Sequence, residues 1–271
     1  MKARRDRFLA LAGKRPLIMG IVNVTPDSFS DGGRFESAAA AVAQARKLVA
    51  EGADIVDVGA ESTRPGHQPV PADVEQARLE PLLRDLIEAV DRPVSVDTSK
   101  AAVARWAASQ GAAFVNDVWG LQKDPAMADA IAEAELGVII MHNRQEADPD
   151  CDVIADIRRF FDHSLRLAAK AGIPLGRIIL DPGIGFGKTK AQNLAALRNL
   201  PALRDYGLPL LVGVSRKSLF GSILGAEVDH RLIATLAANL VAASHGASIF
   251  RVHDAAEHVA AFKVFEAIET A

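Results

Sequence analysis

Short apolar runs alternate with longer amphipathic runs along the chain from Pro16 onward. The apolar runs are rich in valine, isoleucine and leucine, which is typical of strands that are buried on both faces of a parallel sheet. Such runs predict strands at residues 16–24, 54–60, 93–98, 112–118, 137–142, 177–181, 208–215 and 247–253. Alanine- and leucine-rich runs with charges at helical spacing predict helices between them, for example at residues 36–51, 72–90, 100–110, 154–171 and 231–245.

Glycines stand where these helices should end, because glycine readily adopts the left-handed conformation of a helix C-terminus. They are Gly52, Gly111, Gly137, Gly172, Gly207 and Gly246. Strand–helix units repeated eight times without a linker predict one domain, residues 1–271, folded as a closed (β/α)8 TIM barrel. Residues 1–15 would form an N-terminal extension. A doubly wound open sheet is the alternative arrangement.

Polar and ionisable residues follow each predicted strand. In chain order they are Asn23, the segment from Glu61 to Gly66, Asp97, Asn116 with Asp117, His142 after Met141, Asp181, Ser215 to Ser218, and Arg251 with His253. The C-terminal ends of the strands form the active-site face of a barrel. A single polar residue there could simply cap a turn, but a series that follows every strand indicates a functional site.

The most distinctive stretch is RIILDPGIGFGKTK, residues 177–190. Its apolar half ends in Asp181, and its glycine-rich half carries Phe186 and Lys188. The glycine spacing fits neither a phosphate-binding P-loop nor a dinucleotide fingerprint. Gly183, Gly185 and Gly187 are expected to serve turn geometry. We expect Lys188 to be a charge in the loop rather than a catalyst.

The polar residues suggest two kinds of ligand group. Asp97, Asn116 and Asp181 provide acceptors and one amide, which suit a flat heterocycle with ring N–H and amine groups. Arg64, Lys217, Arg251 and His253 suit a phosphate-like anion. Ser218 opens a predicted helix and could hold a second anion such as a carboxylate. Oxygen ligands and phosphate would favour Mg²⁺ if a metal is used. These residues alone predict an enzyme that joins or cleaves at a phosphorylated heterocycle.

Composition narrows the remaining classes of function. The net charge of -3, with lysines and arginines spread along the chain, gives no nucleic-acid footprint. Cys151, the single cysteine, excludes an internal disulfide, fits a reducing compartment and is expected to be structural. No stretch approaches the length of a membrane span, and the N-terminal apolar run is too short for a signal peptide. A cytoplasmic protein is the expectation.

The motif series resembles that of the dihydropteroate synthase family. The matching segments are GIVNVTPDSFSDGGRF, ESTRPG, SVDTSK, FVNDVWG, DPGIGFGKT, VGVSRKSLFG and RVHD, in this order over nearly the whole chain past Lys14. The resemblance implies a TIM-barrel transferase of folate biosynthesis. It would condense 6-hydroxymethyl-7,8-dihydropterin pyrophosphate with 4-aminobenzoate, giving 7,8-dihydropteroate and pyrophosphate.

The resemblance also implies a role for each matching residue. Asp97, Asn116, Asp181 and Lys217 would hold the pterin, with Met141 and Phe186 near its ring. Asn23 would reach Mg²⁺ on the pyrophosphate, whose oxygens would be bound by Thr63, Arg64, Arg251 and His253. The 4-aminobenzoate pocket would comprise Pro26, Phe29, Thr63, Pro65, Phe186 and Ser218. Asp97, Lys217, Arg251 and His253 would be the catalytic residues.

The chain departs from the family pattern at two places. His67 follows STRPG where the family usually has a small residue, and the segment after Met141-His142 lacks a glycine that is often present. Because STRPG is kept and no insertion lies near Phe186, the resemblance implies a sulfonamide-sensitive enzyme; the family precedent is a homodimer. Two alternatives stay open: a paralogue that binds pterin without turnover, and a barrel of the methyltetrahydrofolate–corrinoid methyltransferase type.

Overall fold

The computed structural model describes residues 2–24, 34–61 and 69–271. Within them, parallel strands form one eight-stranded sheet, in the order β6-β5-β4-β3-β2-β1-β8-β7. The strands are β1 (Leu17–Asn23), β2 (Ile55–Gly59), β3 (Val94–Asp97), β4 (Phe114–Asp117), β5 (Gly137–Met141), β6 (Ile178–Asp181), β7 (Leu211–Val212) and β8 (Ile249–Val252). A bridge between Leu180 and Leu210 joins β6 to β7. The predicted barrel is therefore confirmed, and the open sheet is excluded.

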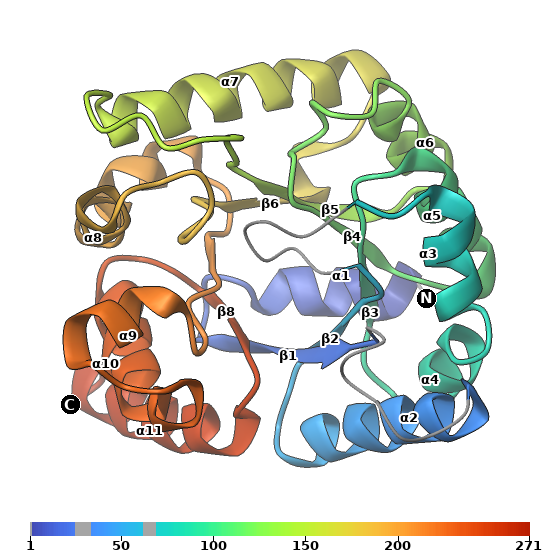
Figure 1. The fold of residues 1–271 in the computed structure, drawn as a ribbon, viewed down its shortest axis with the longest axis horizontal. Helices are drawn as coiled ribbons and strands as arrows, with labels where there is room; N and C mark the ends of the chain where they lie inside the picture. Colours follow the sequence, from blue (N-terminus) through green and yellow to red (C-terminus); the bar gives the residue numbers. More distant parts are fainter. Residues whose placement is uncertain (1, 25–33, 62–68) are drawn as a thin grey trace.

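Helices surround the strands on the outside of the barrel (Figure 1). They are α2 (Arg34–Ala50), α3 (Ala72–Leu79), α4 (Leu83–Ala89), α5 (Ala101–Gln110), α6 (Met127–Glu133), α7 (Val153–Ala171), α8 (Lys190–Arg198), α9 (Ser218–Leu224), α10 (Leu232–Ser244) and α11 (Ala255–Glu269). Short 3-10 helices cover Leu175–Arg177 (η2), Leu200–Tyr206 (η3) and Val228–His230 (η4). Among the described residues, no helix is both long enough and apolar enough to cross a membrane.

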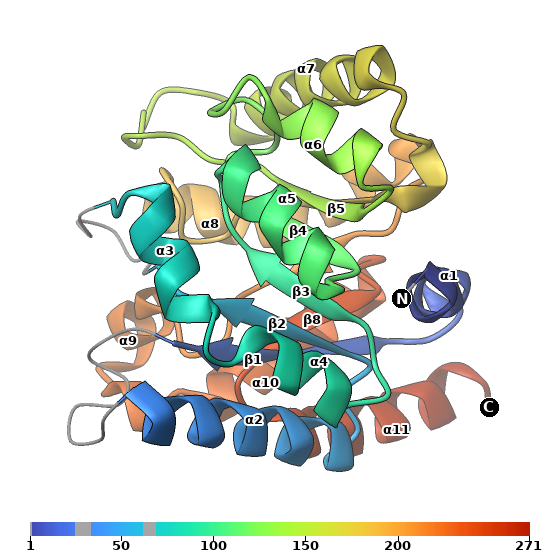
Figure 2. The same cartoon turned by 90° about the vertical axis from the view of Figure 1, so that its right-hand side faces the viewer.

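The predicted N-terminal extension contains a helix, α1 (Lys2–Leu11), which lies at one end of the barrel (Figure 2). Phe8 of α1 is buried, and its ring meets the ring of Phe114 in β4 edge to face at 5.5 Å. Arg4 of α1 also donates to the carbonyl of Val90 at 2.9 Å. The extension thus closes the end of the barrel where the strands begin.

Two details of the predicted elements are wrong. The pattern predicted one helix at residues 72–90, but α3 ends at Leu79 and α4 begins at Leu83. Pro81 lies in this break and has no backbone N–H to continue a helix. Gly137 was expected to end a helix, but it begins β5, where an added Cβ would lie 2.3 Å from the ring of Phe114. Glu135 takes the left-handed conformation instead, with φ of 53°.

The barrel interior is layered from apolar to polar along the strands. One inner layer contains Ile55, Phe114, Ile139, Ile179, Leu211 and Ile249, and all of these side chains are buried. Side chains alternate between the two faces of a strand, so the residue two positions later points the same way. These later residues are Asp57, Asn116, Met141, Asp181, Gly213 and Arg251. Four of them are polar: Asp57, Asn116, Asp181 and Arg251. Together with Asp97, which pairs with Asn116 and contacts Arg251, they form a polar layer directly above the apolar core, towards the C-terminal ends of the strands.

Candidate active site

Arg251 of β8 lies at the centre of the polar layer. Its Nε donates to Oδ2 of Asp57 at 2.7 Å, and its Nη2 donates to Oδ2 of Asp97 at 3.1 Å. Asp57 is fully buried in β2, and Asp97 is 6% exposed at the end of β3. One guanidinium thus bridges two buried carboxylates and offsets the free energy that burying these charges without a partner would cost.

Burial and the neighbouring charges shift the pKa values of Asp97 and Arg251. Burial raises the pKa of Asp97 to about 8; the attraction of Arg251 lowers it again in part, and repulsion from Asp57 adds to the increase. The pKa of Arg251 is raised by Asp57 and Asp97 against the effect of burial. The arginine therefore stays charged, whereas Asp97 can take up a proton when the site holds no ligand.

Asn116 and Asp181 complete the acceptor set. Asn116 stands opposite Asp97 in the β3–β4 pairing, and its Nδ2 donates to Oδ2 of Asp57 at 3.3 Å. Asp181 ends β6 opposite Met141 of β5, and its Oδ1 accepts from the Gly183 N–H at 2.7 Å. Within the described part of the chain, Oδ1 of Asp57 and Oδ1 of Asn116 are buried without a hydrogen-bond partner. Such oxygens are available to N–H groups of a ligand.

Asp117, the neighbour of Asn116, faces the other way. Its two carboxylate oxygens accept from the N–H groups of Trp119 and Leu121, at 2.9 and 2.7 Å. Burial raises its pKa to about 6, although these two hydrogen bonds lower it. Asp117 therefore fixes the turn after β4 and does not belong to the polar layer.

The glycine-rich loop after β6 carries Phe186 to Lys217. The Lys217 ammonium lies 4.4 Å from the centre of the Phe186 ring, a cation–π arrangement, and it also donates to the carbonyl of Ile184. Burial lowers the pKa of Lys217 to about 8, and Asp181 opposes this decrease. Gly183, Gly185 and Gly187 have φ values of 66°, 89° and 53°, so the expected role in turn geometry is confirmed.

Three further predicted residues lie at the rim. His253 follows β8, and its Nδ1 lies 2.9 Å from the Ser215 hydroxyl. Asn23 ends β1 with an exposed side chain, and Ser218 is the exposed first residue of α9, directly after Lys217. The structure thus brings the described site residues to one end of the barrel. Pro26, Phe29, Thr63, Arg64, Pro65 and His67 lie outside the described residues.

Asp57 was missed by the sequence reasoning, which considered only residues at or after the strand ends. A signal was available: an acid stands inside an otherwise apolar strand, two positions after Ile55 and therefore in phase with the barrel interior. His142, one of the polar residues that follow the predicted strands, is 1% exposed and contacts Lys188.

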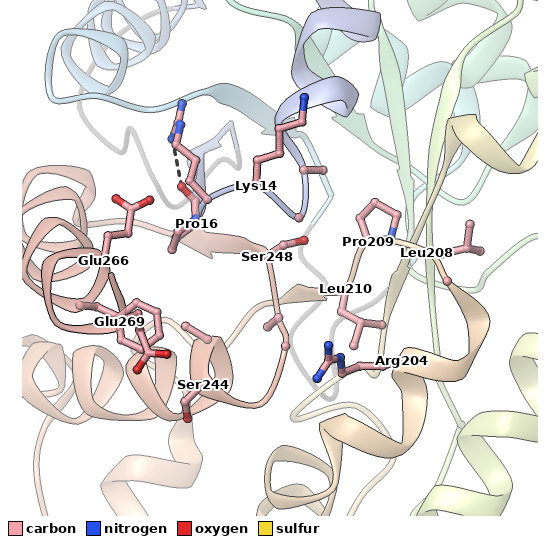
Figure 3. A pocket seen from close by; sticks show the side chains of 18 of the residues that line it. Lys14, Pro16, Arg204, Leu208, Pro209, Leu210, Ser244, Ser248, Glu266 and Glu269 are labelled. Atoms are coloured by element: carbon pink, nitrogen blue, oxygen red, sulfur yellow. Dashed lines mark hydrogen bonds between the residues drawn. The ribbon is translucent and has the colours of Figure 1, made fainter. Parts of the chain in front are cut away.

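A cavity of about 550 Å³ lies at the opposite end of the barrel (Figure 3). Lys14, Arg204, Ser248, Glu266 and Glu269 are among its lining residues, and none of the predicted site residues lines it. Ser248 and Pro16 directly precede β8 and β1, which places this cavity at the N-terminal ends of the strands. That end of a TIM barrel generally serves stability.

Comparisons with known proteins agree with this geometry. The pterin-binding enzyme family matches residues 19–253. A dihydropteroate synthase of Clostridium beijerinckii is 43% identical over 257 residues, which cover 94% of this chain and 95% of that protein. A Clostridium difficile dihydropteroate synthase, solved in the presence of pteroic acid, has a TM-score of 0.92 and 46% identity, covering 95% of this chain and 98% of that one. A Yersinia pestis dihydropteroate synthase, solved with a sulfonamide drug, has a TM-score of 0.89 and 42% identity, with 96% of each chain covered.

Fold, site and relatives therefore converge on one assignment. The match spans most of this chain and most of each relative, so it includes the barrel and the strands that carry the polar layer. The chain belongs to the dihydropteroate synthase family of pterin-binding enzymes, which are transferases of folate biosynthesis.

Proposed function

We propose that the chain condenses 6-hydroxymethyl-7,8-dihydropterin pyrophosphate with 4-aminobenzoate to give 7,8-dihydropteroate and pyrophosphate. The main support for this assignment is the polar layer above the apolar core. Arg251 bridges Asp57 and Asp97 there, and Asn116 donates to Asp57. Asp181 acts on the Arg251 guanidinium electrostatically. Buried acceptors without partners suit the N–H and amine groups of a pterin, and the arginine suits its pyrophosphate.

In the reaction, a bond forms between the 4-aminobenzoate nitrogen and the pterin methylene carbon. The bond from that carbon to the pyrophosphate oxygen breaks, and the nitrogen releases one proton to the solvent. An arylamine is already a nucleophile at neutral pH, so a dedicated base is not required. Arg251 and His253 would stabilise the charge on the leaving pyrophosphate, and Asp97 would stabilise positive charge on the pterin. Donors of the bound pterin would favour the ionised form of Asp97.

The 4-aminobenzoate would lie between Phe186 and Ser218. Phe186 packs against Lys217, and Ser218 follows Lys217 as the first residue of α9. The ring of the substrate would contact Phe186, and its carboxylate would accept a hydrogen bond from the Ser218 hydroxyl. Pro26, Phe29, Thr63 and Pro65 complete this pocket in the proposal, and Arg64 joins the pyrophosphate site.

Magnesium would enter with the substrate. Among the residues that the structure describes, no cluster of three or more His, Cys, Asp or Glu side chains could hold a metal ion. The exposed carboxamide of Asn23 fits an ion that takes most of its ligands from pyrophosphate and water, as Mg²⁺ commonly does. The ion would supply charge neutralisation on the leaving group.

Magnesium dependence is the first prediction. Chelation with EDTA is expected to lower the turnover at least about tenfold, because the leaving pyrophosphate loses charge neutralisation. Asn23→Ala should raise the Mg²⁺ concentration that gives half-maximal rate. Pyrophosphate release measured across a Mg²⁺ titration tests both statements. Equal rates in EDTA and in saturating Mg²⁺ would rule out the proposed role of the ion.

The second prediction is that pyrophosphate release depends on 4-aminobenzoate. With the dihydropterin pyrophosphate and Mg²⁺, release should be rapid when 4-aminobenzoate is present and slow without it. A sulfonamide should raise the apparent KM for 4-aminobenzoate without lowering kcat, because both would occupy the pocket at Phe186 and Ser218. Steady-state kinetics at several sulfonamide concentrations provide the test. Inhibition that does not compete with 4-aminobenzoate would contradict the shared pocket.

The same assay separates the alternative functions. A non-catalytic paralogue would bind the pterin without releasing pyrophosphate. A corrinoid-dependent methyltransferase would need no cationic group for pyrophosphate, whereas Arg251 lies in the polar layer here. The relatives named dihydropteroate synthase further favour the condensation.

We also propose that the chain forms a homodimer through its C-terminal helices. Large apolar side chains of α10 and α11 are exposed: Ile233 is 80% exposed, Val241 50%, Val264 61% and Ile268 69%. A contiguous patch of exposed apolar residues, which these side chains form in the proposal, is typical of an association surface. Sedimentation velocity would contradict the dimer if only a 28.8 kDa species were found.

A cytoplasmic location for the protein stays a prediction.

A further inference from the structure

Lys188 is partly buried beneath the glycine-rich loop that carries Phe186. Its Nζ lies 2.8 Å from the carbonyl oxygen of Gly183, 3.1 Å from the carbonyl oxygen of Phe186 and 2.7 Å from Nδ1 of His142. The Gly183 carbonyl also accepts from the Phe186 N–H at 3.1 Å. One lysine therefore contacts both ends of the turn from Gly183 to Phe186.

His142 is the third contact of the Lys188 ammonium. The histidine follows β5, is 1% exposed, and places its Nε2 3.1 Å from Oδ2 of Asp156 in α7. Its backbone N–H donates to the carbonyl of Asp181 at 2.9 Å. Burial, followed by repulsion from Lys188, lowers the pKa of His142 to about 3. The ring is therefore neutral: Nε2 donates to Asp156, and Nδ1 accepts from Lys188.

The surroundings of Lys188 match an ammonium group, which has three N–H donors and here meets three acceptors. A neutral amine would leave one acceptor without a donor. Burial lowers the pKa of Lys188 to about 7, with Asp181 and Asp156 opposing the decrease. The charged and titratable groups that face it are Asp181, Lys217, Asp156, Arg144 and His142.

The turn held by Lys188 also contacts Lys217 on its other side. Lys217 donates to the Ile184 carbonyl and lies against the Phe186 ring. The Gly185 N–H is held separately by Oδ1 of Asn193 at 2.6 Å. Removing Lys188 would take its N–H donors from two carbonyls of the turn and leave the Gly183 carbonyl with the Phe186 N–H. It would also leave Asp181 on its strand and bonded to the Gly183 N–H.

We propose that Lys188 is a positioning residue for 4-aminobenzoate, because its contacts with the Gly183 and Phe186 carbonyls and with His142 hold the Phe186 ring in place. The proposal rests on the proposed function, since it concerns one substrate of that reaction. Lys188 itself would touch neither substrate. Its effect would be transmitted through Phe186, which separates its role from the catalytic role of Lys217.

A double-mutant cycle tests this connection, because residues that act through one another give non-additive effects. Lys188→Met is expected to raise the KM for 4-aminobenzoate at least about tenfold, while kcat and the KM for the dihydropterin pyrophosphate change less than about threefold. Phe186→Ala should raise the same KM. Adding Lys188→Met to Phe186→Ala should then change it less than about twofold further.

Lys170→Met is the matched control, because Lys170 is exposed in the last turn of α7. It removes the same charge and should leave every kinetic constant unchanged. If Lys188→Met does not fold, judged by circular dichroism, Lys188→Gln replaces it in the cycle. Additive effects of the two substitutions on the KM for 4-aminobenzoate would overturn the proposal. A Lys188→Met variant that loses both kcat and thermal stability, without a selective increase in this KM, would overturn it as well. Wild-type protein without 4-aminobenzoate-dependent turnover would instead refute the proposed function.

Discussion

Asp97→Asn is expected to lower kcat by about 10²- to 10³-fold, the range found when one preorganised electrostatic contact to a transition state is removed. The carboxylate lies in the polar layer beside Arg251, where it would face positive charge that develops on the pterin. The substituted asparagine would keep the size of the side chain but not its charge. Single-turnover kinetics with saturating substrates measure the effect directly.

Asp117→Asn provides the matched control. Asp117 is equally buried and lies at the end of the neighbouring strand, but its oxygens accept from Trp119 and Leu121 outside the polar layer. This variant should lose stability through one weakened turn contact, while kcat changes less than about threefold. Equal kcat values for Asp97→Asn and the wild type would remove Asp97 from the mechanism.

The same Asp97→Asn variant should be more stable than the ligand-free wild type at high pH. Burial raises the pKa of Asp97 to about 8 in the folded protein, against 3.8 for the unfolded reference. The folded state therefore binds a proton that the unfolded state releases, and wild-type stability falls as the pH rises from about 4 to about 8. The asparagine side chain of the variant does not titrate in this range. Urea unfolding at pH 5 and pH 8 should show the stability difference growing with pH, by roughly 3–4 kcal/mol.

Arg251→Met is expected to have the largest effect on folding stability. The variant loses the guanidinium that contacts both Asp57 and Asp97, and breaking a buried ion pair from one side costs about 3–5 kcal/mol. The cost should be smaller at pH 5 than at pH 8. The pKa of Asp97 is raised, so at pH 5 this carboxyl is protonated and leaves no unpaired negative charge. Urea unfolding at the two pH values provides the measurement.

A second variant separates the stability role of Arg251 from its catalytic role. Adding Asp97→Asn to Arg251→Met removes one of the two unpaired carboxylates and should recover part of the lost stability, without recovery of turnover. Arg251→Met protein that unfolds at the same urea concentration as the wild type would contradict the bridging role. Recovered turnover in the double variant would contradict the role of both residues in the reaction.

The barrel was predictable because its strands are continuously apolar and each is followed by an amphipathic run. The errors arose where one residue changed the local outcome. Pro81 divides the predicted helix at residues 72–90, although its hydrophobic pattern continues on both sides. Gly137 follows a predicted helix and so was expected to end it. The structure instead requires glycine there because the ring of Phe114, on the neighbouring strand, leaves no space for a Cβ. Periodicity within one segment cannot reveal such a contact.

The site was predictable where function places a polar residue at the end of a strand. Asn116, Asp181 and Arg251 belong to this class. Asp57 lies inside a strand, so its part in the site depends on the barrel, which brings β2 near β8. Asp57 and Arg251 are 194 residues apart along the chain. The contact of Lys188 with His142 likewise joins two loops, and the sequence alone predicted Lys188 only to be a charge in its loop.

The most direct test of the central claim is the ratio of 7,8-dihydropteroate formed to pyrophosphate released by the purified wild-type protein. Both products would be quantified by mass spectrometry and a coupled pyrophosphate assay after quenching, in Mg²⁺ buffer with both substrates. We expect one dihydropteroate for each pyrophosphate, and neither product in excess of background when 4-aminobenzoate is omitted. Pyrophosphate released without dihydropteroate, or pterin bound without either product, would contradict it.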